Sequence, residues 1–351
     1  QCRFQTIITV RKIGQICSKT KTELARLSST LVKRGLKHIT EIDLMVRFPD
    51  SNLEAAIREL LNKPEGPIYK SDLEKVKKAE FVEKNIKDLT GLEYCINLTE
   101  LNLGNEYRRQ PTLFDNQIKD ITPLSNLSNL NVLNLYRNHI RDISSLSNLT
   151  NLTELHLGKN PINDISPLSN LINLTKLNLW DNQIRDITPL SNLTNLDVLF
   201  LFDTSSIAPL SPLTNLTKLY LGNNPINDIT ALSNLTNLTE LHIGNGSLDD
   251  ITFLSNLTNL TRLSLGSNQI EDITPISNLT NLNAIELSYN QINEITPLSV
   301  LTNLNSIKLG QNYIDDITPL SNSISLTFLE LDHNDKRRKG NTPMLCWLAQ
   351  I

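Results

Sequence analysis

The chain has 351 residues and a net charge of −4 at neutral pH, with 39% hydrophobic and 5% aromatic residues. The charge is uneven, because residues 1–40 carry nine Lys or Arg and a single acidic residue, which gives this segment +8 and the rest of the chain −12. An acidic body does not attract phosphate groups, which argues against nucleic-acid binding by most of the chain, and no apolar run reaches membrane-spanning length.

The amino-terminal segment, residues 1–47, is basic and shows a helical pattern. Leu24, Leu27 and Leu31, with interleaved Lys and Arg, predict an amphipathic helix. Two interpretations stay open for this segment. It contacts a membrane surface or nucleic acid through its positive charge, or it is a solvated helix or flexible leader, which is the simpler interpretation. Residues 7–12 make a poor secretory signal, because the charges follow the apolar run instead of preceding it.

Residues 48–97 are expected to cap the amino-terminal end of a repeat array. The stretch FPDSNLEAAIRELLN, residues 48–62, predicts a helix in which Ser51 and Glu54 have the capping-box spacing. Four apolar side chains would share one face of this helix: Leu53, Ile57, Leu60 and Leu61. Ser71 and Glu74 repeat the same spacing. The segment ends in a degenerate repeat with Lys84 at its consensus Asn position, and its buried residues should be Val76, Ala79, Phe81, Ile86, Leu89 and Leu92.

Residues 98–334 repeat with a period of 22, in ten complete units and one that breaks off. In the unit that starts at Leu152, Leu155 and Leu157 are two residues apart, which is typical of one face of a short strand. Ile162 to Leu171 place apolar residues at intervals of three, which predicts tight 3-10 turns instead of α-helix. Each unit is therefore one coil, with a strand on one side and turns on the other.

No single coil can bury its own leucines, so the coils must stack around a continuous core. We therefore predict an α/β solenoid: a leucine-rich-repeat horseshoe with a parallel sheet on the concave side, 3-10 turns on the convex side and a short helical amino-terminal cap. One Asn recurs after each strand and should satisfy buried backbone groups of successive coils. It stands at Asn138, Asn160, Asn182, Asn224, Asn268, Asn290, Asn312 and Asn334, and is replaced by Thr204 and Gly246 in two units.

The line LxxLxLxxNxI at this period resembles the internalin-like leucine-rich repeats of bacteria, and it is also similar to the intracellular phosphatase-regulator class. The stretch FPDSNLEAAI…DLTGLEYCINLTELNL closely resembles the internalin-type amino-terminal cap, which favours the first family. The resemblance implies the horseshoe fold and a non-enzymatic, bacterial protein-binding module. Such arrays bind many unrelated partners, so it implies no particular partner.

Aromatic side chains gather at outward-facing strand positions in a few consecutive units. Exposed apolar clusters usually mark interfaces, and Trp and Tyr are the commonest hot-spot residues. The candidate partner-binding residues on the concave face are Tyr136, His156, Trp180, Phe200, Phe202, Tyr220 and His242. The alternative is that the rings stack on one another and stabilise the sheet. Charged strand residues of alternating sign, such as Glu154 and Lys176, would either guide the partner or pair with each other.

Two units depart from the period near these residues. The unit of residues 196–215 is two residues short, just after Phe202, so neighbouring coils should part or tilt there and leave a shallow hydrophobic notch between Trp180, Phe202 and Tyr220. The first unit carries a ten-residue insertion, residues 106–115. This loop is a second candidate contact, or else a tolerated surface variation, and its contacts would be Tyr107, Arg108, Arg109 and Phe114.

The sequence contains no pattern of catalytic, cofactor or metal-binding residues, so we expect neither an enzyme nor a cofactor. The two strand histidines would lie about 19 Å apart, too far to share a metal. Four scattered cysteines, Cys2, Cys17, Cys95 and Cys346, fit no disulfide framework. Free thiols weakly favour a reducing compartment, but the sequence does not separate a cytoplasmic from a surface or secreted protein.

The leading hypothesis is an internalin-like recognition module that binds a partner protein through its concave face. The alternative is an intracellular scaffold or regulatory subunit that holds an enzyme such as a phosphatase. In a third hypothesis, the basic segment of residues 1–47 contacts membrane lipid or nucleic acid while the repeats recruit a partner. The repeat pattern is lost after residue 334, so residues 335–351 are expected to form a short cap or a truncated end, with four apolar residues: Met344, Leu345, Trp347 and Leu348.

Overall fold

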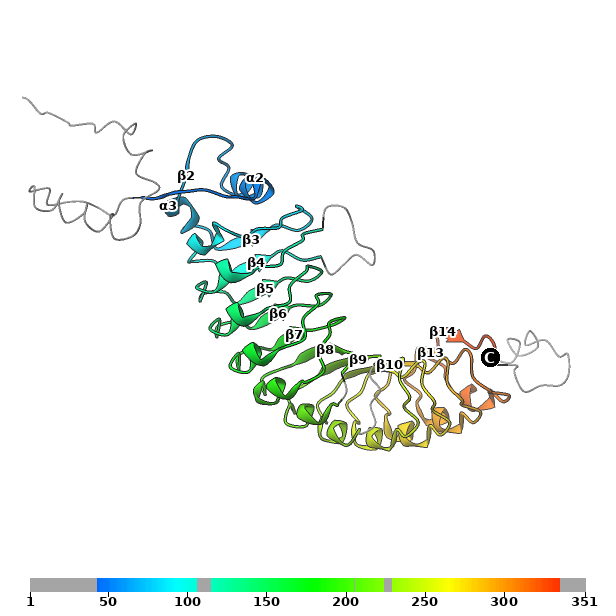
Figure 1. Cartoon of the computed structure of the whole chain (residues 1–351). Helices are drawn as coiled ribbons and strands as arrows, with labels where there is room; N and C mark the ends of the chain where they lie inside the picture. Colours follow the sequence, from blue (N-terminus) through cyan, green and yellow to red (C-terminus); the bar gives the residue numbers. More distant parts are fainter. Residues whose placement is uncertain (1–42, 106–114, 205, 224–228, 335–351) are drawn as a thin grey trace, which may run out of the picture. The chain divides into compact units, whose positions relative to one another are not determined.

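The computed structural model describes residues 43–105, 115–204, 206–223 and 229–334 (Figure 1). The chain divides into two compact units, Gln1–Leu44 and Met45–Ile351. The basic helix expected near Leu24 and the cap or tail expected for residues 335–351 therefore lie outside the described residues. The second unit contains the amino-terminal cap and the repeats.

The cap begins with an antiparallel pair of short strands and a helix. Strand β1 (Met45–Val46) pairs antiparallel with β2 (Ile68–Tyr69), and helix α2 (Ser51–Leu60) lies between them in the chain. The sequence pattern does not predict this strand pair, because two-residue strands are too short to show a periodicity. A second short helix, α3 (Lys70–Leu73), follows β2.

Helix α2 starts one residue earlier than the predicted capping box requires. Asp50 is the N-cap, and its carboxylate accepts hydrogen bonds from the amides of Asn52 at 2.8 Å and Leu53 at 3.1 Å. The assignment of Ser51 and Glu54 as a capping box was therefore wrong. Glu54 instead forms an ion pair with Arg58 at 2.7 Å, one turn further along the helix.

The buried face of α2 is also narrower than expected. Leu53 and Ile57 are fully buried, but Leu60 is 40% exposed, because the helix contacts the core along one stripe only. In α3 the carboxylate of Asp72 accepts a hydrogen bond from the Tyr69 amide at 3.0 Å. This places the start of α3 before Ser71, so the second predicted cap was wrong as well.

The repeats build one parallel sheet of 12 strands in chain order, from β3 to β14. Each strand pairs with the next in register, so Leu155 lies beside Leu177 and Leu177 beside Leu199. The predicted leucine-rich-repeat horseshoe is therefore confirmed. The strands are β3 (Lys78–Glu80), β4 (Glu100–Asn102), β5 (Val132–Asn134), β6 (Glu154–His156), β7 (Lys176–Asn178), β8 (Val198–Phe202), β9 (Lys218–Gly222), β10 (Glu240–Gly244), β11 (Arg262–Ser264), β12 (Ala284–Glu286), β13 (Ser306–Lys308) and β14 (Phe328–Glu330).

The return path of each coil contains a 3-10 helix, as the three-residue spacing predicted. In Figure 1 the strands follow the inner side of the curved repeat unit and these helices its outer side. The helices are η2 (Leu92–Tyr94), η3 (Thr122–Leu124), η4 (Ser144–Leu146), η5 (Ser166–Leu168), η6 (Thr188–Asn192), η7 (Ala208–Leu210), η8 (Thr230–Asn234), η9 (Thr252–Asn256), η10 (Thr274–Asn278), η11 (Thr296–Val300) and η12 (Thr318–Leu320). A carboxylate before most of them accepts the first free amide, as Asp120 does from Thr122 at 2.8 Å.

Between the strands and the turns, the repeat leucines and isoleucines form one continuous core and are almost fully buried. The Asn ladder runs beside this core. The side chain of Asn160 donates to the carbonyls of Leu135 at 3.0 Å and Leu157 at 2.9 Å, and it accepts from the Ile140 amide at 3.0 Å. The structural role predicted for the ladder is therefore confirmed at the described positions; Asn224 lies outside them.

The ladder has one further member that the repeat spacing does not reveal. The Asn116 side chain accepts from the Ile86 amide at 2.8 Å and donates to the carbonyls of Phe81 at 2.7 Å and Leu103 at 2.9 Å. The ten-residue insertion moves this Asn out of the usual spacing, which hid it. Asn116 therefore connects the degenerate cap repeat to the first full unit.

Candidate functional site on the strand face

The strand face carries the two outward columns of side chains that alternation predicts. In the first column, Phe200 lies between Asn178 and Tyr220, and Tyr220 lies beside His242. In the second column, Phe202 lies beside Gly222. The leucines between these positions are buried, so the column side chains form the surface of the sheet.

In the first column, aromatic rings stack from strand to strand. The rings of Phe200 and Tyr220 are parallel within 3°, with centroids 4.2 Å apart, and the His242 ring follows at 6.4 Å. Burial, with a hydrogen bond to Glu240, raises the pKa of the Tyr220 hydroxyl. Burial lowers the pKa of His242, which favours its neutral form.

In the second column, a glycine makes room for two rings. The Trp180 and Phe202 rings are 4.6 Å apart and inclined at 52°. A Cβ atom on Gly222 would lie 2.6 Å from the Phe202 ring and 2.8 Å from the Trp180 ring. The absence of a side chain at Gly222 therefore lets both rings lie close against the sheet.

Tyr136 and His156 make other contacts. The Tyr136 ring lies over Gly158, where a Cβ would come within 2.5 Å, and Tyr136 is only 9% exposed. The His156 Nε2 atom lies 2.7 Å from a carboxylate oxygen of Glu154. Burial alone would raise the pKa of Glu154, but His156 and Lys176 outweigh it and lower the pKa. Tyr136 thus contributes little exposed surface, and His156 is engaged with its own strand.

The coils were predicted to separate near Phe202, but among the described residues the structure shows only one missing backbone hydrogen bond there, outside the sheet. Strands β8 and β9 pair through five residues, from Val198 with Lys218 to Phe202 with Gly222, so the sheet does not open there. Beyond the strands, Lys159 and Asp203 each donate an amide to the next coil, whereas Asp181 makes no corresponding bond to Phe202 within the described chain. The notch expected between Trp180, Phe202 and Tyr220 is not open between the first two residues, because their rings are in contact.

The chain is similar to known leucine-rich-repeat proteins. A family model for two copies of leucine-rich repeats matches residues 128–170, 172–215, 214–256 and 258–300. The solved structure of an internalin, InlF, from Listeria monocytogenes is 36% identical, with a TM-score of 0.71, and the match covers 84% of this chain and 93% of that one. The chain belongs to the internalin family. Its bacterial, leucine-rich-repeat character is thereby established.

Two further solved structures are similar to this internalin-like chain. Internalin C2 of Listeria monocytogenes is 33% identical, with a TM-score of 0.53, over 69% of this chain and 94% of that one. The ectodomain of the Arabidopsis thaliana receptor kinase GASSHO1/SCHENGEN3, solved in complex with CASPARIAN STRIP INTEGRITY FACTOR 2, is 27% identical, with a TM-score of 0.58, over 68% of this chain and 30% of that one. No curated protein matches the chain. These relatives support a protein-binding module.

Most charged strand residues of the internalin-like sheet pair with one another. Lys176 lies 3.2 Å from Glu154, and Lys218 lies 3.5 Å from Glu240, both across neighbouring strands. Of the two interpretations of the alternating charges, cross-strand pairing is the one that the geometry supports. These exposed pairs add little stability, but they neutralise the charge around the aromatic rings.

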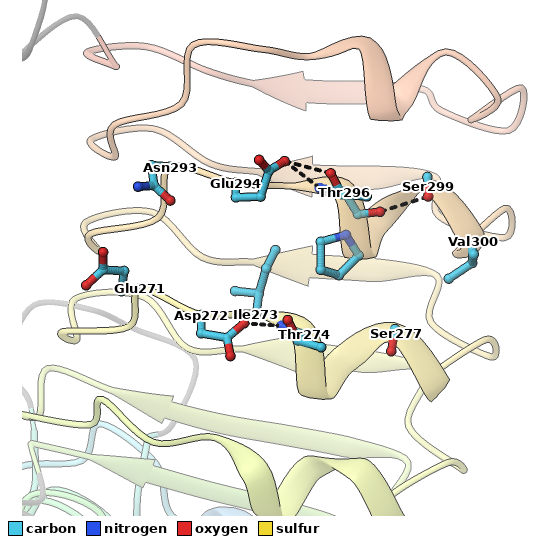
Figure 2. Close-up of a pocket in the computed structure, with 11 residues that line it drawn as sticks. Glu271, Asp272, Ile273, Thr274, Ser277, Asn293, Glu294, Thr296, Ser299 and Val300 are labelled. Carbon is cyan, nitrogen blue, oxygen red and sulfur yellow. Dashed lines mark hydrogen bonds between the residues drawn. The ribbon is translucent and has the colours of Figure 1, made fainter.

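A groove of about 650 Å³ on the turn side was not anticipated. Its lining residues, most of which Figure 2 labels, are Glu271, Asp272, Ile273, Thr274, Ser277, Asn293, Glu294, Thr296, Pro297, Ser299 and Val300. The carboxylate of Asp272 accepts the Thr274 amide at 2.8 Å, and that of Glu294 accepts the Thr296 hydroxyl at 2.6 Å. The groove is therefore a space between successive turns whose carboxylates already cap 3-10 helices.

Other expected features fall outside the described residues. The insertion residues Tyr107, Arg108, Arg109 and Phe114 lie outside them.

Within residues 43–334, apart from the gaps, no group of three or more His, Cys, Asp or Glu could hold a metal ion. In the same part of the chain no helix has the length and apolar character needed to cross a membrane. Cys95 is buried in the core, where desolvation raises the pKa of its thiol to about 12.

Proposed function

We propose that this internalin-like chain recognises a partner protein through the concave strand face. The contact would centre on Trp180, Phe200, Phe202 and Tyr220, which we call the aromatic surface, and His242, Tyr136 and His156 would flank it. The observation that carries the proposal is the gathering of these four rings on three consecutive coils, outside the leucine core and only partly buried.

The packing of these rings suits them to binding. Phe200 stacks on Tyr220, and Trp180 packs on Phe202, so each ring already occupies one orientation before a partner arrives. A preorganised side chain loses little conformational entropy on binding, and large aromatic residues are the usual hot spots of interfaces. Mutual stacking, the alternative explanation of the cluster, is thus compatible with a binding role.

The relatives agree with this function in general terms. Internalins and a plant receptor ectodomain share the fold, and the plant ectodomain was solved in complex with CASPARIAN STRIP INTEGRITY FACTOR 2. The proposal extends the protein-binding role to this chain and adds its location. The intracellular scaffold stays a second hypothesis, with the same surface and a partner from the bacterium itself.

The test compares capture of proteins from host and bacterial lysates by two variants of the full chain. W180A/F202A/Y220A removes three rings of the aromatic surface. I172A/Y289A/V300A removes three exposed apolar side chains at other positions and serves as the control. We expect the first variant to weaken binding of the captured protein at least a hundredfold, because each hot-spot ring contributes about 2 kcal/mol or more. The control should bind as the wild type does.

Thermal unfolding must accompany the capture, because a misfolded variant would also lose binding. The aromatic variant should unfold within a few degrees of the wild type, since its rings lie outside the leucine core. If it folds and captures the same partner with unchanged affinity, the proposal is wrong. The lysate that supplies the partner decides between the recognition module and the intracellular scaffold.

A further inference from the structure

Two carboxylates stand directly after two of the rings. Asp181 follows Trp180, and Asp203 follows Phe202, at equivalent positions of adjacent coils. Both residues are exposed, and both have a left-handed backbone, with φ of 55° and 57°. Asn178 pairs with Phe200 across β7 and β8, and Asp181 and Asp203 each follow three residues later on these adjacent coils.

These two carboxylates differ from the other acidic residues beside the aromatic surface. Glu154 and Glu240 each have a lysine partner on a neighbouring strand. Neither Asp181 nor Asp203 forms an ion pair within the described chain. Lys159 occupies the equivalent position of the preceding coil, and it does not form an ion pair with Asp181. Burial and the charge of Asp181 together raise the pKa of Asp203. The two carboxylates therefore repel each other, and a cation would relieve this repulsion.

The backbone is also irregular at this place. The amides of Lys159 and Asp203 donate to the next coil at 2.7 Å and 3.3 Å, and the bond from Asp181 to Phe202 that would continue this series is missing. The break lies next to the shortened coil of residues 196–215, in which two residues are deleted just after Phe202. The irregular coil, the ring pair and the carboxylate pair thus coincide.

We infer that Trp180 and Phe202, with Asp181 and Asp203, together receive a basic side chain of the partner protein, and that arginine suits them best. The inference rests on the proposed function and adds the chemistry of the partner. A cation is attracted to aromatic rings and to carboxylates, and the planar guanidinium can stack on a ring while it donates to two acids. The lysines of β7 and β9 are already paired with glutamates and do not neutralise Asp181 and Asp203. The negative charge of these two carboxylates therefore complements a positive charge on the partner.

The experiment uses short peptides in place of the unidentified partner. The probe is acetyl-Gly-Arg-Gly-amide, and its matched control replaces arginine with citrulline, which has nearly the same shape but no charge. Binding is followed on the full chain by the NMR signal of the Trp180 indole N–H. Trp347→Phe removes the other tryptophan signal, because the chain has two tryptophans.

The arginine peptide should shift the Trp180 signal, and the citrulline peptide should bind at least tenfold more weakly. D181N/D203N should weaken the arginine peptide at least tenfold. The control variant E271Q/D315N removes two exposed acids at other positions and should bind as the wild type does. Equal binding of the two peptides, or unchanged binding by D181N/D203N, would overturn the inference.

The peptide result and the capture result can fail separately. If capture depends on the aromatic surface but the arginine peptide does not shift Trp180, the inference is wrong and the proposed function stands. If the arginine peptide binds through Asp181 and Asp203 but no captured protein depends on the rings, the cation site stands as a site and its assignment to a partner protein is overturned.

Discussion

At the scale of single residues, the buried asparagines connect successive coils of the stack through hydrogen bonds to the backbone. Asn290 donates to the carbonyls of Leu265 and Leu287, both at 3.0 Å, and accepts from the Ile270 amide at 3.0 Å. One side chain thus satisfies three backbone groups in two successive coils. No apolar residue could do so, because buried amides and carbonyls need partners.

Replacement of Asn290 by alanine should lower the free energy of unfolding by about 2–4 kcal/mol, since each buried polar group left without a partner is unfavourable by about 1–3 kcal/mol. The control is Asn303→Ala, whose exposed side chain makes one hydrogen bond, to the Thr280 carbonyl. Its effect should stay below about 1 kcal/mol. Urea unfolding followed by circular dichroism measures both, and equal losses would contradict the role of the ladder.

At the scale of elements, Asp50 joins the capping helix to the degenerate repeat of the cap. Its carboxylate accepts the amides of Asn52 and Leu53 at the start of α2, and also those of Lys87 at 2.7 Å and Asp88 at 3.2 Å. Burial alone would raise the pKa of Asp50, but these four backbone donors outweigh it and lower the pKa below 3.8. The folded state therefore binds the Asp50 proton less tightly than the unfolded state does.

Asp50→Asn should destabilise the protein at neutral pH by about 1 kcal/mol, the typical effect of losing a helix cap. Because the folded pKa is lowered, the stabilisation is complete above the ordinary carboxyl pKa of 3.8 and disappears as the pH falls through the folded value. The difference in unfolding free energy between wild type and variant should therefore shrink below pH 4. Glu65→Gln, at an exposed position of the same cap, should show no such change. A difference that stays constant to low pH would refute this role of Asp50.

At the scale of the whole molecule, the second unit is a stack in which each coil contacts its neighbours. Helix α2 closes its amino-terminal end, with Leu53 and Ile57 fully buried against the core. In such a solenoid, stability is close to a sum of contributions from repeats and from the interfaces between them. A substitution that weakens the cap should therefore destabilise the strands next to it first.

Ile57→Ala should lower the free energy of unfolding of the capped end by about 2–4 kcal/mol, as is usual when a buried isoleucine is truncated. Hydrogen exchange should accelerate first in β3 and β4, while β10 and β11 keep their protection. Leu60→Ala, on the exposed side of the same helix, should change little. Uniform acceleration in all strands would show instead that the stack unfolds as one cooperative unit.

The sequence by itself determined where the strand and the turns lie in each repeating coil. Leucines two apart must face one side of a strand, and apolar residues three apart fit a 3-10 turn, so the period of 22 is enough to assign the strands of the repeats and both outward columns, although not the short strands of the cap. It did not reveal Asn116, whose place the insertion conceals, nor Asp50 as the helix cap, because several neighbouring polar residues could take that role.

Only the tertiary structure decided which side chains meet on the strand face. Alternation placed Trp180, Phe202 and Tyr220 on the same surface, but Trp180 packs on Phe202, and Tyr220 stacks on Phe200. The orientation of a ring depends on the space beside it, and here Gly222 supplies that space from the next coil. The spacing of residues thus fixes the face that a side chain occupies, whereas its neighbours across the strands fix what it touches.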